Sequence, residues 1–136
     1  FMECYDDAEE VITKRQDGKV QIVLENIYFD LNKWDIKPDA ARILDVLIEL
    51  LNKYPEMYIE IDAHTDSRAT ATYNLMLSDR RAKATLEYLV KNGINRNRLK
   101  SKGYGESQPL IECGKTRICT EQEHSINRRC EFIILK

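Results

Sequence analysis

Two stretches of helical periodicity, separated by one short strand-like run, constrain the fold of this chain most. Apolar residues recur at helical spacing over residues 40–54, and a proline ends that helix. A second helix is predicted from about Thr72 to Asn92, with Gly93 as its C-terminal cap. The run between them, "MYIEIDA", predicts a strand with Ile59 and Ile61 on one face.

Further strands are predicted on both sides of these helices. An Asp17-Gly18 turn between two strand-like runs indicates a β-hairpin near the start of the chain. Later, "RLKSKGYGE" predicts a short strand and a turn, "EQEHSIN" one helical turn, and "RRCEFIILK" a final strand. Gly103, Gly105 and Glu106 are assigned to turn chemistry and not to ligand contacts. The order β-β-α-β-α-β-loop-β predicts an α+β fold, a mixed sheet with two long helices packed on one face.

Length and charge exclude several classes of protein. The 136 residues suit a single domain, and 43% hydrophobic with 32% charged residues is typical of a globular protein. The net charge of −2 leaves no basic excess for phosphates, which argues against nucleic acid as a partner. No apolar run approaches the ~20 residues that span a bilayer, so no transmembrane segment is predicted. Because the chain opens on Phe1 and shows no signal peptide, we interpret it as a fragment of a longer, processed protein.

The cysteines bear on the cellular compartment. Cys113 and Cys119 flank "GKTRI", a spacing that a local disulfide can close, and a disulfide would imply an oxidising compartment. A metal site that combines these cysteines with His124 is less favoured, because paired C-x-x-C spacings are absent. Cys130 alternates with apolar residues on the predicted last strand and is interpreted as a small buried hydrophobe. A pairing of Cys130 with Cys4 is left open.

Two adjacent arginines on the second helix face different surroundings. At ~100° per residue, Arg80 lies opposite the apolar face and points to solvent, whereas Arg81 lies at the border of that face. The apolar face is predicted to centre on Leu75, Ala82, Leu86 and Leu89. A border arginine often extends along apolar surface or pairs with an acid, so a structural role is one interpretation of Arg81.

A ligand pocket is the other interpretation. The start of the second helix must lie near the end of the strand that precedes Asp66, which brings Asp66, Asn74 and Arg81 together. Arg81 offers a planar fork for a carboxylate, Asp66 offers a carboxylate for an ammonium group, and Asn74 can donate and accept. The complementary ligand is an amino-acid head group, unless Asp66 and Arg81 simply satisfy each other.

Four segments of the chain then point to a family. They are "NIYFDLNKWDIKP", "HTDSRATATYNLMLSDRRAKATLEYLVKNGI", "GYGESQP" and "NRRCEF". In this order they resemble the OmpA-like C-terminal domain, a peptidoglycan-binding module, over roughly residues 20–135. The resemblance implies a β/α sandwich in which two long helices pack on a mixed sheet. We therefore assign residues 20–136 to this domain, and residues 1–19 to a lead-in and the first arm of the hairpin.

The resemblance also implies a ligand. Such domains hold the meso-diaminopimelate residue of the peptidoglycan stem peptide without altering it, which implies a binding protein with no catalytic residues, cofactor or metal. By its motif, Asp66 would bind the amino group of that residue, and Arg81 would bind its carboxylate. The other residues expected to line the pocket are Asn32, Asn74, Arg128 and Thr65, the last through backbone contacts. Asn127 and Arg129 would hold the local structure.

Three positions depart from the family pattern. Ala63 and Ala69 stand where glycine is usual, and Arg68 adds a charge where small or neutral residues are usual. If the backbone at residue 69 takes a positive φ, alanine there would cost about 1 kcal/mol or reshape the loop.

The cysteine loop, "C…C-x-E-x-E-H-x-x-NRR", resembles versions common in Bacteroidota. There such domains end outer-membrane lipoproteins, some of which serve type IX secretion. The resemblance thus implies a periplasmic anchor attached to the outer membrane through its parent protein. Its partners would be the stem peptide and, through the rest of that parent, outer-membrane proteins.

Two other functions are alternatives. A hydrolase would use His64, Asp66 or Glu60, but alternation along "IEIDAHTD" divides these groups between two faces of the strand. No serine or cysteine lies in a plausible nucleophile elbow either. A protein–protein interaction module would retain the fold around a degenerate pocket, with Asp66 and Arg81 as a structural ion pair.

Overall fold

The structure, a computed structural model, describes residues 12–114 and 118–135. The elements are, in chain order, β1 (Ile12–Lys14), β2 (Val20–Ile22), α1 (Pro38–Lys53), β3 (Ile59–His64), α2 (Ala71–Lys91), the 3-10 helix η2 (Arg96–Arg98), β4 (Leu99–Gly105), α3 (Glu121–Asn127) and β5 (Arg129–Ile134). The predicted order of strands and long helices is confirmed. The hairpin arms are only three residues each, however, and α3 exceeds the single expected turn. Within the described ranges, no helix combines the length and apolarity needed to cross a membrane.

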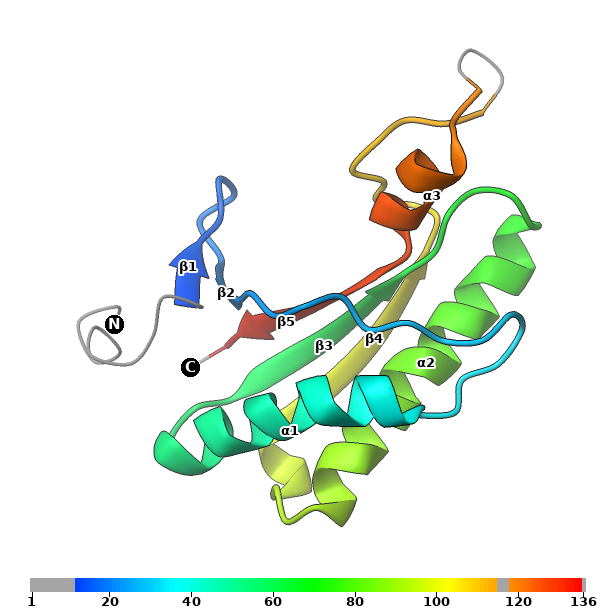
Figure 1. Cartoon of the computed structure of the whole chain (residues 1–136). Helices are drawn as coiled ribbons and strands as arrows, with labels where there is room; N and C mark the ends of the chain where they lie inside the picture. The colour runs from blue at the N-terminus through cyan, green and yellow to red at the C-terminus, as the bar shows by residue number, and fades with distance from the viewer. Residues whose placement is uncertain (1–11, 115–117, 136) are drawn as a thin grey trace.

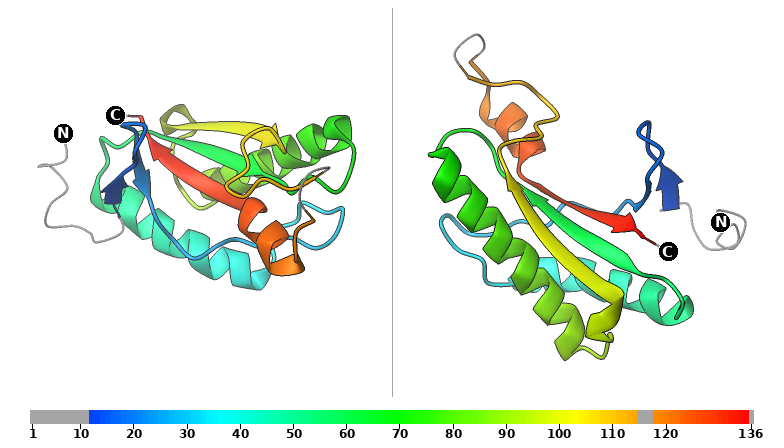
Figure 2. Two further views of the ribbon diagram at one scale, coloured as in Figure 1. Left: turned by 90° about the horizontal axis from the view of Figure 1, so that it is seen from above. Right: turned by 180° about the vertical axis from the view of Figure 1, so that it is seen from behind.

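The strands form one mixed sheet in the order β1-β2-β5-β3-β4. β3 and β4 are parallel, which requires a crossover connection, and α2 supplies it. The pairs β1–β2, β2–β5 and β3–β5 are antiparallel. α1 and α2 lie on one face of the sheet (Figures 1 and 2). The predicted α+β fold is therefore confirmed.

The main core lies between α1 and the sheet. α1 begins at Pro38, whose fixed φ and missing N–H suit a first helical turn. Its apolar stripe places Leu44 and Leu47 at 0% exposure, against Ile59 and Ile61 of β3, which are equally buried. Burial of a side chain of this size contributes about 1.5–3 kcal/mol. This packing fixes β3, and with it the loop that follows β3.

The start of α2 packs on β4 in a way that the sequence pattern does not predict. Leu75, expected at the centre of the apolar face, is 52% exposed, whereas Asn74 and Ser78 are buried. The cause is the backbone of β4, because a Cβ at Gly103 would come within 2.2 Å of the backbone nitrogen of Asp79. At so close an approach only small side chains fit between helix and strand.

The remaining predictions for this region have mixed outcomes. Ala82, Leu86 and Leu89 of α2 are buried, as predicted. The turn role of Gly103 is wrong, because this residue lies inside β4. Gly105 ends the strand with a φ of 58°, which agrees with its predicted turn role.

Between β2 and α1 the chain leaves the sheet and crosses toward α2 (Figure 1). Ile27 anchors this segment in the core at 3% exposure. Asn32 has a φ of 59°, a left-handed conformation that asparagine tolerates better than most residues, next to a turn in which Lys33 N donates to Asp30 O at 3.0 Å. The segment thereby presents backbone carbonyls toward α2.

On the other face of β3, Asp62 is a buried carboxyl group. It is 3% exposed, it lies opposite Glu131 in the register with β5, and its Oδ1 has no hydrogen-bond partner among the described residues. Burial, a side-chain hydrogen bond with Glu60, and the charges of Glu60 and Glu131 raise the pKa of Asp62 to about 8, against a smaller opposing effect of Lys19. Asp62 is therefore protonated in the folded protein at neutral pH.

This raised pKa predicts a stability that falls with pH. In the unfolded chain the pKa of an aspartate is near 3.8, so between about pH 4 and pH 8 the folded state binds the extra proton and loses stability as pH rises. Asp62→Asn should leave stability near pH 4 unchanged and raise the free energy of unfolding at pH 9 by at least about 2 kcal/mol. Urea unfolding at several pH values measures this. Asp35→Asn, at an exposed loop position, is the control, and equal pH profiles of Asp62→Asn and wild type would refute the prediction.

Candidate functional site

A cavity of about 470 Å³ opens at the end of β3. Its walls are the segment 27–32, residues 63–69, the first half of α2, and residues at and around the ends of α3. Its lining includes all six residues predicted to contact a ligand: Asn32, Thr65, Asp66, Asn74, Arg81 and Arg128. The fold therefore brings these residues together. Their roles toward a ligand stay predictions.

Asp66 lies just after β3 and is 9% exposed. Its Oδ1 accepts the backbone N–H of Arg68 at 3.0 Å, and its Oδ2 accepts Arg68 Nη2 at 2.8 Å and Arg128 Nη1 at 2.9 Å. Burial alone would raise the pKa of Asp66, but the hydrogen bonds from the two arginines outweigh it and hold this pKa well below its usual range. Asp66 is thus an anion at any physiological pH.

Arg81 reaches the cavity from α2. Its Nε donates to Lys33 O at 2.9 Å and its Nη2 to Asp30 O at 3.0 Å, and the guanidinium lies 5.0 Å from the ring centre of Phe29. These acceptors are neutral carbonyls, and in the described parts of the chain Arg81 forms no ion pair with a carboxylate. Burial also lowers the pKa of Arg81, though arginine keeps its charge at neutral pH. The alternative in which Asp66 and Arg81 form a structural pair is wrong, because Asp66 pairs with Arg68 and Arg128 instead.

Asn74 shapes the loop beside Asp66. Its Nδ2 lies within hydrogen-bond distance of Asp66 O (3.1 Å), Ala69 O (3.3 Å) and Glu106 Oε1 (3.1 Å). Glu106, assigned to turn chemistry, therefore also supports Asn74. Ala69 is not in the left-handed region, where Asn32 is the only non-glycine residue among those described. The possible strain of an alanine at position 69 therefore does not arise.

Thr65 and Asn32 also line the cavity. The backbone N–H of Thr65 donates to Gly105 O at 2.8 Å, which joins the loop to β4. Its Oγ1 is buried and has no hydrogen-bond partner among the residues that the structure describes. Asn32 Oδ1 accepts a hydrogen bond from Tyr73 Oη at 2.5 Å, and this bond joins the 27–32 segment to α2.

Sequence reasoning missed Glu121, which completes a charged cluster. Glu121 Oε2 accepts Arg68 Nη1 at 2.8 Å, and Glu121 Oε1 accepts Arg128 Nη2 at 2.6 Å. Two arginines and two carboxylates thus alternate at one edge of the cavity. Glu121 is 55 positions from Asp66 in the sequence (121 − 66), and no motif signals their contact. Of the residues in this cluster, Arg68 stands out as unusual in the sequence, because its charge departs from the family pattern.

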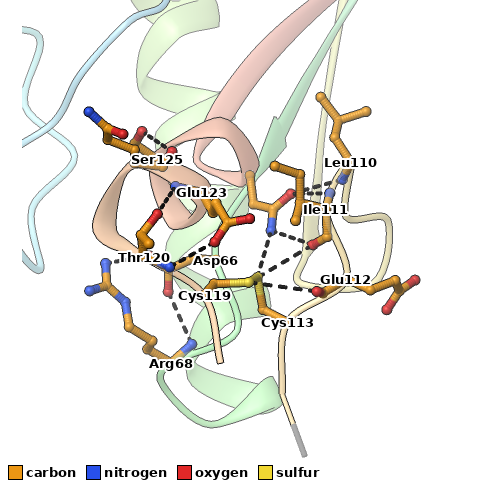
Figure 3. Close-up of a disulfide and its surroundings, with 12 residues drawn as sticks. Asp66, Arg68, Leu110, Ile111, Glu112, Cys113, Cys119, Thr120, Glu123 and Ser125 are labelled. Atoms are coloured by element: carbon orange, nitrogen blue, oxygen red, sulfur yellow. Dashed lines mark hydrogen bonds and ion pairs between the residues drawn. A yellow bond between two sulfur atoms is a disulfide. The ribbon is translucent and has the colours of Figure 1, made fainter. Parts of the chain in front are cut away.

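The cysteine loop leads directly to Glu121. Cys113 and Cys119 form the predicted disulfide, with 5.6 Å between their Cα atoms (Figure 3). The next residue, Thr120, caps α3 by a capping box in which Glu123 takes part. Because the two sulfurs are bonded to each other, they are not thiolate ligands for a metal. Behind this loop Asn127 bonds the backbone of residues 110 and 111, which agrees with its predicted structural role.

The other cysteine predictions concern Cys130 and Cys4. Cys130 is a free thiol that lines the cavity and packs against the core. Burial raises the pKa of Cys130 to about 12, so its thiol stays neutral. Its side chain is only partly buried, and the predicted buried position is therefore confirmed in part. Cys4 lies outside the described residues.

His64, one of the groups that a hydrolase would use, is held by contacts within the protein. His64 is 4% exposed, its Nε2 lies 3.2 Å from Glu131 Oε1, and its ring stacks on Tyr104 with 5.1 Å between centres. Burial lowers the pKa of His64, while the hydrogen bond to His64 and the charge of Arg129 lower the pKa of Glu131 to about 2 against the effect of burial. Arg129 also donates to Glu131, at 3.1 Å, and this bond supports its predicted structural role.

The comparisons with known proteins agree with this architecture. A family model described as "OmpA family" matches residues 28–119, more than half of the chain. The chain is 42% identical over 89 residues to a peptidoglycan-associated lipoprotein of Rhizobium meliloti (strain 1021), a match that covers 65% of this chain and 51% of that protein. It thus spans about half the length of the curated relatives it matches.

Solved structures share the fold along most of the chain. The crystal structure of the peptidoglycan-associated lipoprotein from Burkholderia pseudomallei has a TM-score of 0.69 and 25% identity, covering 80% of this chain and 88% of that one. A MotB-like protein from Desulfovibrio vulgaris has a TM-score of 0.72 and 27% identity, covering 91% and 80%.

Proposed function

This chain belongs to the OmpA family, and on that basis we propose that it binds peptidoglycan without altering it chemically. The names of similar proteins support the proposal, because the relatives from Rhizobium meliloti and Burkholderia pseudomallei are called peptidoglycan-associated lipoproteins. The engagement of His64 by Glu131 and Tyr104 supports a non-catalytic role.

We further propose that the ligand is the meso-diaminopimelate residue of the stem peptide. One observation carries this step: a cavity holds both the anionic Asp66 and the half-buried Arg81, whose charge has no carboxylate partner in the described part of the chain. A residue with an ammonium and a carboxylate on one carbon matches that pair. In this arrangement Asp66 receives the ammonium group and Arg81 the carboxylate. Asn32, Thr65, Asn74 and Arg128 complete the contacts.

The proposal extends to the parent protein. Residues 20–136 form the binding domain, and the rest of the parent attaches it to the outer membrane, where it meets other outer-membrane proteins, so that the domain acts in the periplasm. The resemblance of the cysteine loop to Bacteroidota sequences suggests a lipoprotein of that group, and a place in a type IX secretion assembly. A single stem-peptide site has modest affinity, so firm anchoring would come from many copies on a polymeric wall.

The test is a calorimetric titration of the oxidised chain with two stem peptides, one with meso-diaminopimelate and one with lysine at the same position. The lysine peptide lacks the carboxylate assigned to Arg81. We expect the diaminopimelate peptide to bind at least about tenfold more tightly, which corresponds to 1.4 kcal/mol. Asp66→Ala should weaken the binding of both peptides, because both carry the ammonium group assigned to Asp66, and circular dichroism should show that this variant is folded.

A protein–protein interaction module with a degenerate pocket is the second candidate. The observation in its favour is that Arg68 and Arg128 already neutralise Asp66. Equal binding of the two peptides, or no binding of either, would support this candidate and refute the diaminopimelate site.

A further inference from the structure

The carboxylate of Asp66 is already occupied by cations from its own chain. Its Oδ2 accepts two guanidinium N–H groups, from Arg68 at 2.8 Å and from Arg128 at 2.9 Å, and its Oδ1 accepts the Arg68 backbone N–H. A carboxylate offers about four acceptor positions. An ammonium group that approached this cluster would therefore find one free position and the repulsion of two positive charges.

Of these two arginines, Arg68 is the one that can withdraw. Its side chain is 49% exposed, against 29% for Arg128, so less packing opposes its movement. Arg68 also has a second anion within reach. Its Nη1 donates to Glu121, whose side chain is 63% exposed. Arg68 can leave Asp66 and keep its bond to Glu121.

We propose that Arg68 is a specificity-determining residue of this cavity, an internal cation that competes with the ligand's ammonium group for Asp66. The inference rests on the proposed function, since it concerns the same site. In the free protein Arg68 holds Asp66, and in the complex it withdraws to Glu121 while the ammonium takes its place. Only a ligand whose remaining contacts offset this displacement binds, so Arg68 discriminates against simple amines and against ligands without the carboxylate for Arg81.

Glu121 links this competition to the cysteine loop. The disulfide closes just before Thr120, which caps α3 together with Glu123 (Figure 3). Glu121 is the first residue of this helix. Figure 3 places Arg68 and Asp66 beside the start of this helix. The disulfide and the capping box thus fix the stretch of backbone from which the Glu121 side chain extends.

The test compares Arg68→Gln with the wild type, using two forms of the diaminopimelate stem peptide. One form has the free side-chain amine, and in the other this amine is acetylated. Arg68→Gln should bind the free-amine peptide about fivefold more tightly than the wild type does, with no gain for the acetylated peptide. General electrostatics predicts the opposite sign, because the stem peptide is acidic and the substitution removes a positive charge. Arg96→Gln removes an exposed arginine that pairs with Glu87, and it should change neither affinity.

The outcomes of this test distinguish a failure of this inference from a failure of the proposed function. If the wild type binds and Arg68→Gln binds the free-amine peptide equally or more weakly, the inference is wrong while the proposed function stands. Equal gains for both peptides would also overturn it, because the gain would not concern the ammonium group. If neither protein binds either peptide, both proposals fail. Binding by Arg68→Gln alone would support the competition at Asp66 but refute the proposed function of the wild-type chain.

Discussion

Gly103→Ala is expected to lower the free energy of unfolding by about 3 kcal/mol, because β4 has no room for a side chain at this position. An added Cβ would lie 2.2 Å from the backbone nitrogen of Asp79 and 2.5 Å from Ser78 Oγ. The nearest atom belongs to the α2 backbone, so relief requires the whole helix to move. Urea unfolding measures the loss. Because Asn74 and Arg81 lie on α2, ligand binding should weaken as well.

Gly93→Ala is the matched control. Its Cβ would meet nothing within 4 Å, but Gly93 has a φ of 101°, so only backbone strain opposes the substitution. That strain costs about 1 kcal/mol. A loss at Gly103 no larger than the loss at Gly93 would show that α2 adjusts easily, and that the close approach of α2 to β4 does not determine the fold.

The sequence predicts the fold wherever burial follows a simple period. α1 has a continuous apolar stripe that includes Leu44 and Leu47, and β3 alternates around Ile59 and Ile61, so both were predictable. The packing of the start of α2 was not predictable, because backbone atoms and polar side chains, and not apolar side chains, fill the space between this part of the helix and the sheet. The close approach of α2 to β4 at Gly103 depends on a residue of the strand that follows the helix. The apolar periodicity within α2 therefore cannot reveal it.

The candidate site also has a part that the sequence predicts and a part that it does not. Asp66, Asn74 and Arg81 could be grouped from the sequence, because a strand end and the helix that follows it are adjacent in space and in the chain. The partners of these residues could not. The structural pair of Asp66 with Arg81 was the simplest expectation from two opposite charges. The contacts that replace it involve Arg128 and, through the charged cluster, Glu121, whose positions depend on the cysteine loop and on the register of β5.

The charges around the cavity indicate which part of a ligand contributes most to its affinity. Arg68 and Arg128 carry two positive charges that Asp66 and Glu121 balance, which leaves the charge of Arg81 in excess. The cavity as a whole therefore attracts an anionic group first, and a carboxylate at Arg81 would break no ion pair among the described residues. If the proposed site is correct, the ammonium group binds only by exchange with Arg68. Affinity should accordingly depend more on Arg81 than on any other residue of the lining.

Arg81→Ala is therefore expected to weaken binding of the diaminopimelate stem peptide by about 30- to 100-fold. The estimate corresponds to the 2–3 kcal/mol that a hydrogen-bonded ion pair contributes when one partner is lost. The free energy of unfolding should also fall, by about 1 kcal/mol, because the carbonyls of Asp30 and Lys33 lose their donor. Calorimetric titration and urea unfolding, done on the same preparation, measure the two effects separately.

Arg80→Ala is the control that separates a binding role from a general effect of charge or helix stability. Arg80 is the adjacent residue on α2, it is exposed, and its guanidinium lies 4.6 Å from the ring centre of Trp34 and outside the cavity lining. Arg80→Ala removes the same charge from the same helix but leaves the cavity lining unchanged, so peptide affinity should change less than twofold. Arg81→Lys adds a second comparison, since lysine keeps the charge but loses the planar fork, and its affinity should fall between the wild type and Arg81→Ala. Equal losses for the Arg80 and Arg81 variants would mean that long-range charge, and not a carboxylate held by Arg81, determines binding.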